Sequence, residues 1–180
     1  MRLDSRHSVL LLIDVQEKLF PHIENADALE RHLITLIKGV QALGIPIVCN
    51  QQYTKGLGAT ISSVAQCLGN LPVYEKSTFS CCLNEDMMQT LQTLHVKTVI
   101  VAGIESHICV QQSIMDLLEK GFDVIACADA MGSRKQVNHD LALRRLEQEG
   151  CLLGSTESIL FEFLGSATHE AFKIISQLVK

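Results

Sequence analysis

Three reactive side chains, Asp14, Lys76 and Cys109, each follow a short apolar run of the chain. A cysteine can act as a nucleophile, a carboxylate can take its proton and return it to a leaving group, and a lysine can stabilise the charges. The set would therefore support covalent hydrolysis of a carbonyl compound. Ordinary alternatives stay open, since Asp14 could be a helix cap or an ion-pair partner and Lys76 a surface lysine.

Cys109 lies close to the expected start of a helix near Ser106. A helix N-terminus and a nearby lysine both lower the pKa of a thiol. An unperturbed thiol of pKa about 8.5 is only about 3% ionised at pH 7, whereas a pKa of about 6.5 would make roughly 75% of it thiolate. The sequence thus predicts an activated Cys109, while we expect the other thiols to be buried or incidental: Cys49, Cys67, Cys81, Cys82, Cys127 and Cys151.

Six short apolar runs alternate with amphipathic segments and predict the strands of a parallel sheet. The expected strands are 9–13, 45–49, 72–74, 98–102, 124–127 and 151–153. Apolar residues at helical spacing predict helices over 29–40, 61–68, 87–94, 114–118 and 137–146, and a closing helix over 172–179. Right-handed crossovers place helices on both faces, so we expect one three-layer α/β/α domain over residues 1–180.

The composition narrows the class of protein. The chain has 180 residues, 47% of them hydrophobic and 19% charged, which is typical of a single globular domain. A net charge of -5 without a basic run argues against nucleic acid, and no apolar stretch is long enough for a membrane span. Seven cysteines without a repeated C-x-x-C pair or a secretory leader favour a reducing, intracellular location, which is the cytoplasm or, as an open alternative, an organelle.

The same sequence gives no motif for a metal or a cofactor. None of the seven histidines forms a tight pair at a spacing that suits two ligands on one helix face. The glycines of 55–58 lack the spacing of a phosphate loop, and we expect this segment to be a flexible wall of the substrate pocket. The weakly periodic stretch 50–60 is expected to be a loop that borders a site. We therefore expect neither a metal nor a cofactor.

Three motifs surround the reactive residues: Asp-Val-Gln at 14–16, Glu-Lys-Ser-Thr-Phe-Ser at 75–80 and Gly-Ile-Glu-Ser-His-Ile-Cys-Val at 103–110. With them the chain resembles the isochorismatase-like cysteine hydrolases, in which Asp, Lys and Cys occur in this order and setting. The likeness spans roughly residues 9–164. Two further stretches, 51–58 and 129–134, are similar to the metal-free subgroup that includes the mammalian isochorismatase domain-containing proteins.

The resemblance implies a six-stranded sheet of order 3-2-1-4-5-6, with the site where the first and fourth strands adjoin. It implies a cis peptide at Ile104–Glu105 and an oxyanion hole made by the amides of Glu105 and Cys109. Asp14 would be the general base and acid, and Lys76 its electrostatic support. The candidates for the substrate pocket are Gln16, Phe20, Gln52, Tyr53 and Phe79.

Departures from the family narrow the expected reaction. Nicotinamidases carry Asp-x-His-x-x-His after the second strand, whereas residues 50–55 here contain no histidine, and true isochorismatases lack the cysteine. We therefore expect hydrolysis of a small amide or related carbonyl compound through a thioester. Two alternatives stay open: an idle domain for protein association or small-molecule binding, and a redox sensor. The resemblance also implies a homo-oligomer, with the apolar stretch 161–164 either at an interface or in the core.

Overall fold

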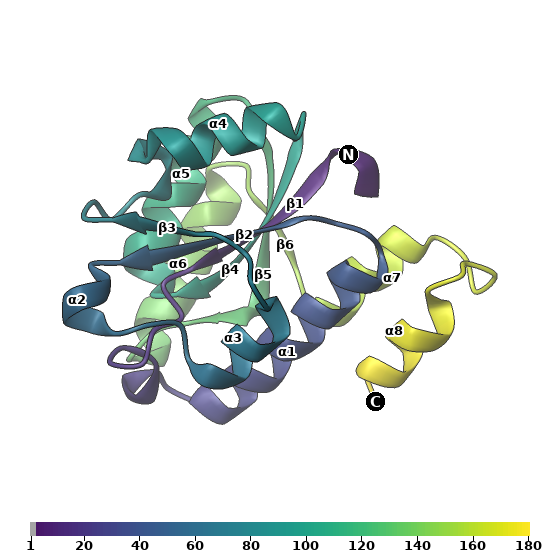
Figure 1. Ribbon diagram of the computed structural model, residues 1–180, viewed down its shortest axis with the longest axis horizontal. Coiled ribbons are helices and arrows are strands. Elements are labelled where there is room, and N and C mark those ends of the chain that lie inside the picture. Colours follow the sequence, from purple (N-terminus) through teal and green to yellow (C-terminus); the bar gives the residue numbers. More distant parts are fainter. Residues whose placement is uncertain (1–2) are drawn as a thin grey trace.

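A parallel six-stranded sheet forms the centre of the protein, whose residues 3–180 are described by a computed structural model. The strands are β1 (Ser8–Ile13), β2 (Ile47–Gln52), β3 (Val73–Lys76), β4 (Thr98–Ile104), β5 (Asp123–Gly132) and β6 (Leu152–Gly154). Their order is β3-β2-β1-β4-β5-β6, and every neighbouring pair is parallel (Figure 1). The expected fold and strand order are confirmed. Since β1 and β4 lie side by side at the reversal of strand order, their carboxyl ends define the edge at which such sheets bind ligands.

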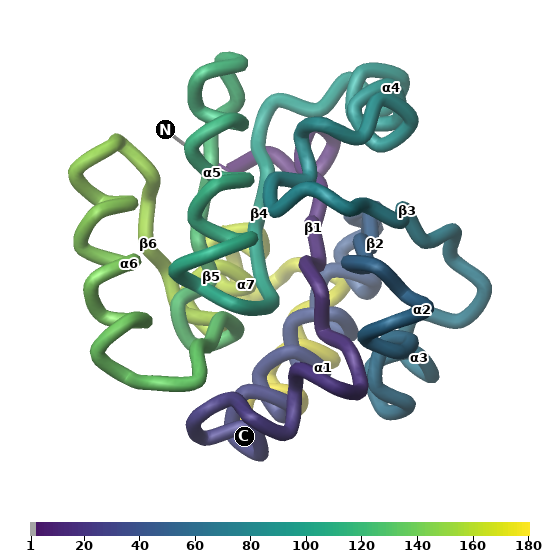
Figure 2. The backbone as a smooth tube through the Cα atoms, turned by 90° about the vertical axis from the view of Figure 1, so that its left-hand side faces the viewer, coloured from purple at the N-terminus to yellow at the C-terminus, as the bar shows by residue number. Residues whose placement is uncertain are grey.

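Helices cover both faces of this sheet, and the two faces are named here after their central helices. The α1 face carries α1 (Ala26–Ala42), α3 (Ser62–Leu68), α7 (Thr156–Leu164) and α8 (Phe172–Leu178). The α5 face carries α4 (Glu85–Thr93), α5 (Gln111–Glu119) and α6 (Gln136–Gln148). Figure 2 shows α4 and α5 on one side of the strands and α1 on the other.

Strand alternation sorts the core residues between the two faces. On β1, Leu10 and Leu12 belong to the apolar cluster of the α1 face, whereas Leu11 and Ile13 belong to that of the α5 face. All six residues of β1 are buried, which explains why the strand shows no polar alternation in the sequence. The central strand is therefore fixed from both sides, and Asp14 follows it directly.

Several elements differ from the expectation. Strand β2 runs on to Gln52, and a short helix α2 (Thr54–Leu57) follows, so the stretch 50–60 is only partly a loop. Helix α7 was not expected. It begins at a capping box formed by Ser155 and Ser158, and it contains the apolar stretch 161–164, of which Leu164 is buried and Phe161 is 38% exposed.

Helix α6 corrects one predicted packing stripe. Leu146 is buried as expected, but Val137 and Leu141 are each 57% exposed. The helix lies towards the edge of the sheet, over β5 and the three-residue strand β6, so its first turns have little apolar surface to cover. Within residues 3–180, none of the helices is both long and apolar enough to cross a membrane.

Candidate active site

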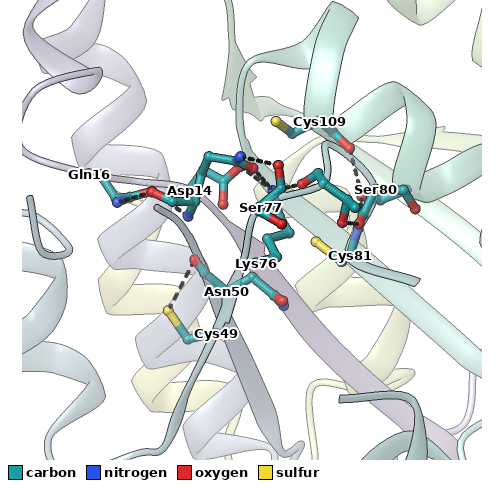
Figure 3. A network of polar contacts seen from close by, with 12 residues as sticks. Asp14, Gln16, Cys49, Asn50, Lys76, Ser77, Ser80, Cys81 and Cys109 are labelled. Atoms are coloured by element: carbon teal, nitrogen blue, oxygen red, sulfur yellow. Dashed lines mark hydrogen bonds and ion pairs between the residues drawn. The ribbon is translucent and has the colours of Figure 1, made fainter. Parts of the chain in front are cut away.

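A buried ion pair lies at the carboxyl edge of the sheet. Lys76, the last residue of β3, places its Nζ 2.7 Å from Oδ2 of Asp14, and both side chains are almost fully buried. The ammonium group also donates to Oε1 of Gln52 at 2.7 Å and to the carbonyl oxygen of Thr78 at 3.2 Å. Three acceptors therefore fix the lysine, which is no surface residue. Figure 3 shows Lys76 beside Asp14.

Asp14 is held in an unusual conformation directly after β1. Its φ of 54° is left-handed, a region that few residues other than glycine adopt, and its amide donates to the carbonyl oxygen of Asn50. Burial raises the pKa of the Asp14 carboxyl, and the charge of Lys76 opposes that rise. The carboxylate is thus a stronger proton acceptor than an exposed aspartate, yet it is held beside a cation.

Cys109 lies in the π-helical turn Ser106–Val110, which joins β4 to α5. Its side chain belongs to the α5-face cluster, and only 8% of the residue is exposed. Burial raises the pKa of the Cys109 thiol to about 12; the charge of Asp14 adds to the rise, and that of Lys76 opposes it. The expected activated thiolate is therefore wrong for the resting protein. The sequence showed the helix and the lysine but not the burial.

The backbone brings these groups together through one close approach. Gly103 has a φ of +123°, and a Cβ at this position would lie 2.1 Å from the carbonyl oxygen of Ile13. Only glycine lets β4 pass so near the end of β1. The next peptide but one, Ile104–Glu105, is cis, as expected. The turn that carries Cys109 starts directly after it.

The expected pocket residues separate into two groups. Gln52 contacts Lys76, and the side chains of Tyr53 and Phe79 are about half exposed near the same edge. Phe20, in contrast, packs in the α1-face cluster, and Gln16 is fully buried, where its amide donates to the carbonyl oxygens of Gln52 and Gly58. The prediction that Gln16 and Phe20 line a pocket is wrong, because both side chains support the loops from inside.

Asn50 is a polar residue of this region that the sequence reasoning missed. Its side chain is fully buried, and neither Oδ1 nor Nδ2 has a hydrogen-bond partner; Oδ1 of Asp14 is also without one. Asn50 follows Val48 by two positions on β2, so its side chain faces the α5 side, as Cys109 does. The available signal was its position directly after the apolar run 45–49, at the carboxyl end of the expected strand. Among the described residues, no group of three or more His, Cys, Asp or Glu side chains could hold a metal ion.

Comparisons with known proteins agree on one family and one fold. Residues 8–158 match the isochorismatase domain family. Isochorismatase family protein 1B of Dictyostelium discoideum is 34% identical over 96% of this chain and 86% of its own length, and the secreted isochorismatase effector Isc1 of Phytophthora sojae is 34% identical over 99% and 87%. The solved structure of the MAR1 ribonuclease from Caenorhabditis elegans has a TM-score of 0.94 and 33% identity, covering 99% of this chain and 92% of that chain.

Proposed function

Because the chain belongs to the isochorismatase family of hydrolases, we propose that it hydrolyses a small amide or related carbonyl compound through a thioester on Cys109. One observation carries the proposal: a buried ion pair between Asp14 and Lys76 lies against the thiol. Burying two charges is costly, and a pair of well-packed apolar side chains is often more stable. Chemistry at the thiol explains why this pair is present.

Acylation starts from the neutral thiol. Asp14 accepts the proton of Cys109 as Sγ attacks the carbonyl carbon, so that a C–S bond forms and the carbonyl oxygen takes the negative charge. When the tetrahedral intermediate collapses, the C–N bond breaks and Asp14 returns the proton to the departing amine. The raised pKa of Asp14 favours the transfer of the proton from Cys109, because it makes the difference in pKa between the thiol and the carboxyl smaller.

Deacylation uses the same carboxylate in the opposite order. Asp14 takes a proton from water, the hydroxide adds to the thioester carbonyl, and the C–S bond breaks to release the carboxylic acid. The proton then returns to Cys109, which restores the neutral thiol. Lys76 stays charged through both halves and stabilises whichever partner, thiolate or carboxylate, carries the negative charge.

The developing oxyanion needs donors that are fixed before the reaction. We assign this role to the backbone amides of Glu105 and Cys109, which flank the first residues of the π-helical turn. The carbonyl oxygen of Glu105 accepts from the amides of Ile108 and Val110, which orders the same turn. Preorganised donors of this kind contribute roughly 10²–10³ to kcat.

Partners and location follow from the same proposal. The substrate is a small molecule, and the protein is expected to form a homo-oligomer in the cytoplasm. A relative is described as a secreted effector and a similar structure as a ribonuclease. A net charge of -5 without a basic run disfavours binding to a phosphate backbone, so we expect no cleavage of RNA.

The test combines a library of small amides and esters with intact-mass detection of the protein. Wild type, Cys109→Ala and the control Cys67→Ala are incubated with each compound while ammonia, amine or acid release is followed; Cys67 lies on α3, on the α1 face. We expect an acyl adduct and turnover in wild type and Cys67→Ala, and neither in Cys109→Ala. Turnover that survives in Cys109→Ala, or RNA cleavage without amide hydrolysis, would contradict the proposal. No adduct and no turnover with any compound would favour an idle binding domain.

A further inference from the structure

Three consecutive residues at the start of the Cys109 turn each hold a different group of the segment 133–139. The carboxylate of Glu105 accepts from the backbone amide of Arg134 at 3.0 Å and from its Nε at 3.0 Å. Oγ of Ser106 lies 2.8 Å from Nδ1 of His139. His107 continues the series, so the segment contacts the turn at every position before Ile108.

The contacts of His107 define its tautomer. Its Nε2 lies 3.3 Å from Nδ2 of Asn138, which can only donate, so Nε2 accepts. The proton of the ring is then on Nδ1, which donates to Oγ of Ser133 at 2.9 Å. Neither ring nitrogen is left for a proton-transfer role towards Cys109, and the imidazole acts as a bridge.

The bond between Ser106 and His139 involves a buried hydroxyl group. Ser106 is fully buried, and its hydroxyl donates to Nδ1 only if that nitrogen is unprotonated. Burial lowers the pKa of His139, although Asp140 opposes the shift, so the ring is neutral at neutral pH. A buried hydroxyl with no acceptor would be costly, and His139 removes that cost.

The packing of α6 explains why polar contacts are needed here. Its first turns expose Val137 and Leu141, so little apolar burial holds this half of the helix to the domain. The helix nevertheless packs against the turn 106–110. The hydrogen bonds of the segment 133–139 therefore provide the attachment that the missing apolar stripe does not.

We propose that His139 is a positioning residue for Cys109, acting through Ser106 to fix the turn that carries the nucleophile and the oxyanion amides. The inference rests on the proposed function of Cys109 and adds a residue to it that touches no reacting atom. Ser106 and Cys109 lie in the same turn, three residues apart. If Ser106 loses its bond to His139, the turn is held less firmly and the thiol of Cys109 points in a different direction. A displacement of the nucleophile by about 1 Å lowers the reaction rate roughly 10²-fold. We expect substrate affinity to depend much less on the position of the thiol.

The test uses two substitutions at one position. His139→Leu removes the acceptor, while His139→Asn keeps a polar atom near the place of Nδ1 that can accept from Ser106. We expect His139→Leu and Ser106→Ala each to lower kcat by about 10- to 100-fold with little change in KM, and the double variant to lose no more than either. His139→Asn should stay within a few fold of wild type. The control is Val137→Ala, which is exposed on the same helix.

Hydrogen exchange of the peptide 104–110 provides a readout that needs no substrate. Exchange there should quicken in His139→Leu and stay near the wild-type rate in His139→Asn. Equal losses of kcat in the Leu and Asn variants, or unchanged kcat and exchange in His139→Leu, would overturn the proposal. If wild type shows no turnover at all, the function of Cys109 fails, and the exchange data alone then decide whether His139 orders the turn.

Discussion

The two faces of the sheet are built from the same strands and differ in what they bury. On the α1 face, a continuous cluster joins Leu33 and Leu36 of α1 to β1, β4 and β5; its buried thiols are Cys49 and Cys127, and Cys67 packs against it. The α5 face contains a similar cluster, which includes Cys109, but towards the carboxyl edge of the sheet the apolar packing is replaced by the ion pair of Lys76 and Asp14. The α1 face therefore contributes mainly to stability, whereas the α5 face has polar groups in place of part of its apolar packing and holds the reactive cysteine.

The difference shows where strain and desolvation are concentrated. The left-handed Asp14, the close approach at Gly103 and the unpartnered oxygen Oδ1 of Asp14 all lie within a few residues of the ends of β1 and β4. Such features cost stability and persist only where the surrounding structure fixes them. The apolar cluster of the α1 face supplies that support, which leads to a graded set of predictions.

The largest loss of stability is expected for a substitution of Gly103, which lies on β4 beside the end of β1. Gly103→Ala would place a methyl group 2.1 Å from the carbonyl oxygen of Ile13, in a left-handed conformation. We expect a loss of about 4 kcal/mol or more in the free energy of unfolding, measured in urea. Gly121→Ala is the control, since its φ of +84° is also left-handed but nothing lies within 4 Å of the added Cβ. A similar loss in both variants would mean that backbone strain alone accounts for the effect.

Lys76→Met should be the next most costly change, because it leaves Asp14 buried without its cation. We expect a loss of about 3–5 kcal/mol at pH 7. Without Lys76, the pKa of Asp14 rises further above its value in the unfolded chain, so the protonated carboxyl is favoured in the folded state. The loss should therefore be small below about pH 4, near the unfolded pKa, and should grow as the pH rises above it.

Urea unfolding of Lys76→Met at acid and neutral pH measures this dependence. The control is Lys38→Met, an exposed lysine on α1 that should change stability little at either pH. An equal loss at both pH values would show that Lys76 contributes packing rather than charge.

Leu36→Ala tests the supporting face. Leu36 is fully buried in the α1 cluster, and its truncation should cost about 3 kcal/mol in the free energy of unfolding. Because the site lies on the other face, the pKa of Cys109 in the folded variant should not move. A shift of that pKa would show that the two faces are coupled more tightly than their packing suggests.

The smallest effect is expected at Leu83, which ends the short turn Cys81–Leu83 between β3 and α4. Cys81 and Cys82 are buried, whereas Leu83 is 65% exposed. Leu83→Ser should therefore change the free energy of unfolding by no more than about 0.5 kcal/mol. A larger loss in the isolated protein would mean that the side chain is covered in solution, as in a homo-oligomer, and a dilution series would reveal it.

Features of the structure that depend on local sequence pattern could be predicted from the sequence. Six apolar runs gave the strands, and placing Asp14 and Cys109 after the two central strands was enough to expect them at one edge. Depths of burial were not predictable: Cys109 is enclosed beside a carboxylate, which reverses the expected direction of its pKa shift. The stripe containing Val137 and Leu141 looked like a packing face, because the pattern does not show that α6 lies near the edge of the sheet.

The central claim is that the resting site holds a neutral Cys109 thiol beside the charged pair of Asp14 and Lys76. The most direct measurement is a pH titration of Cys109 by carbon NMR of the protein labelled at cysteine Cβ, with Cys109→Ser to assign the signal. We predict a pKa of about 12 in wild type and a lower value in Asp14→Asn, because the negative charge of Asp14 raises the thiol's pKa. A wild-type pKa at or below the ordinary value of about 8.5, or no decrease in Asp14→Asn, would contradict the claim.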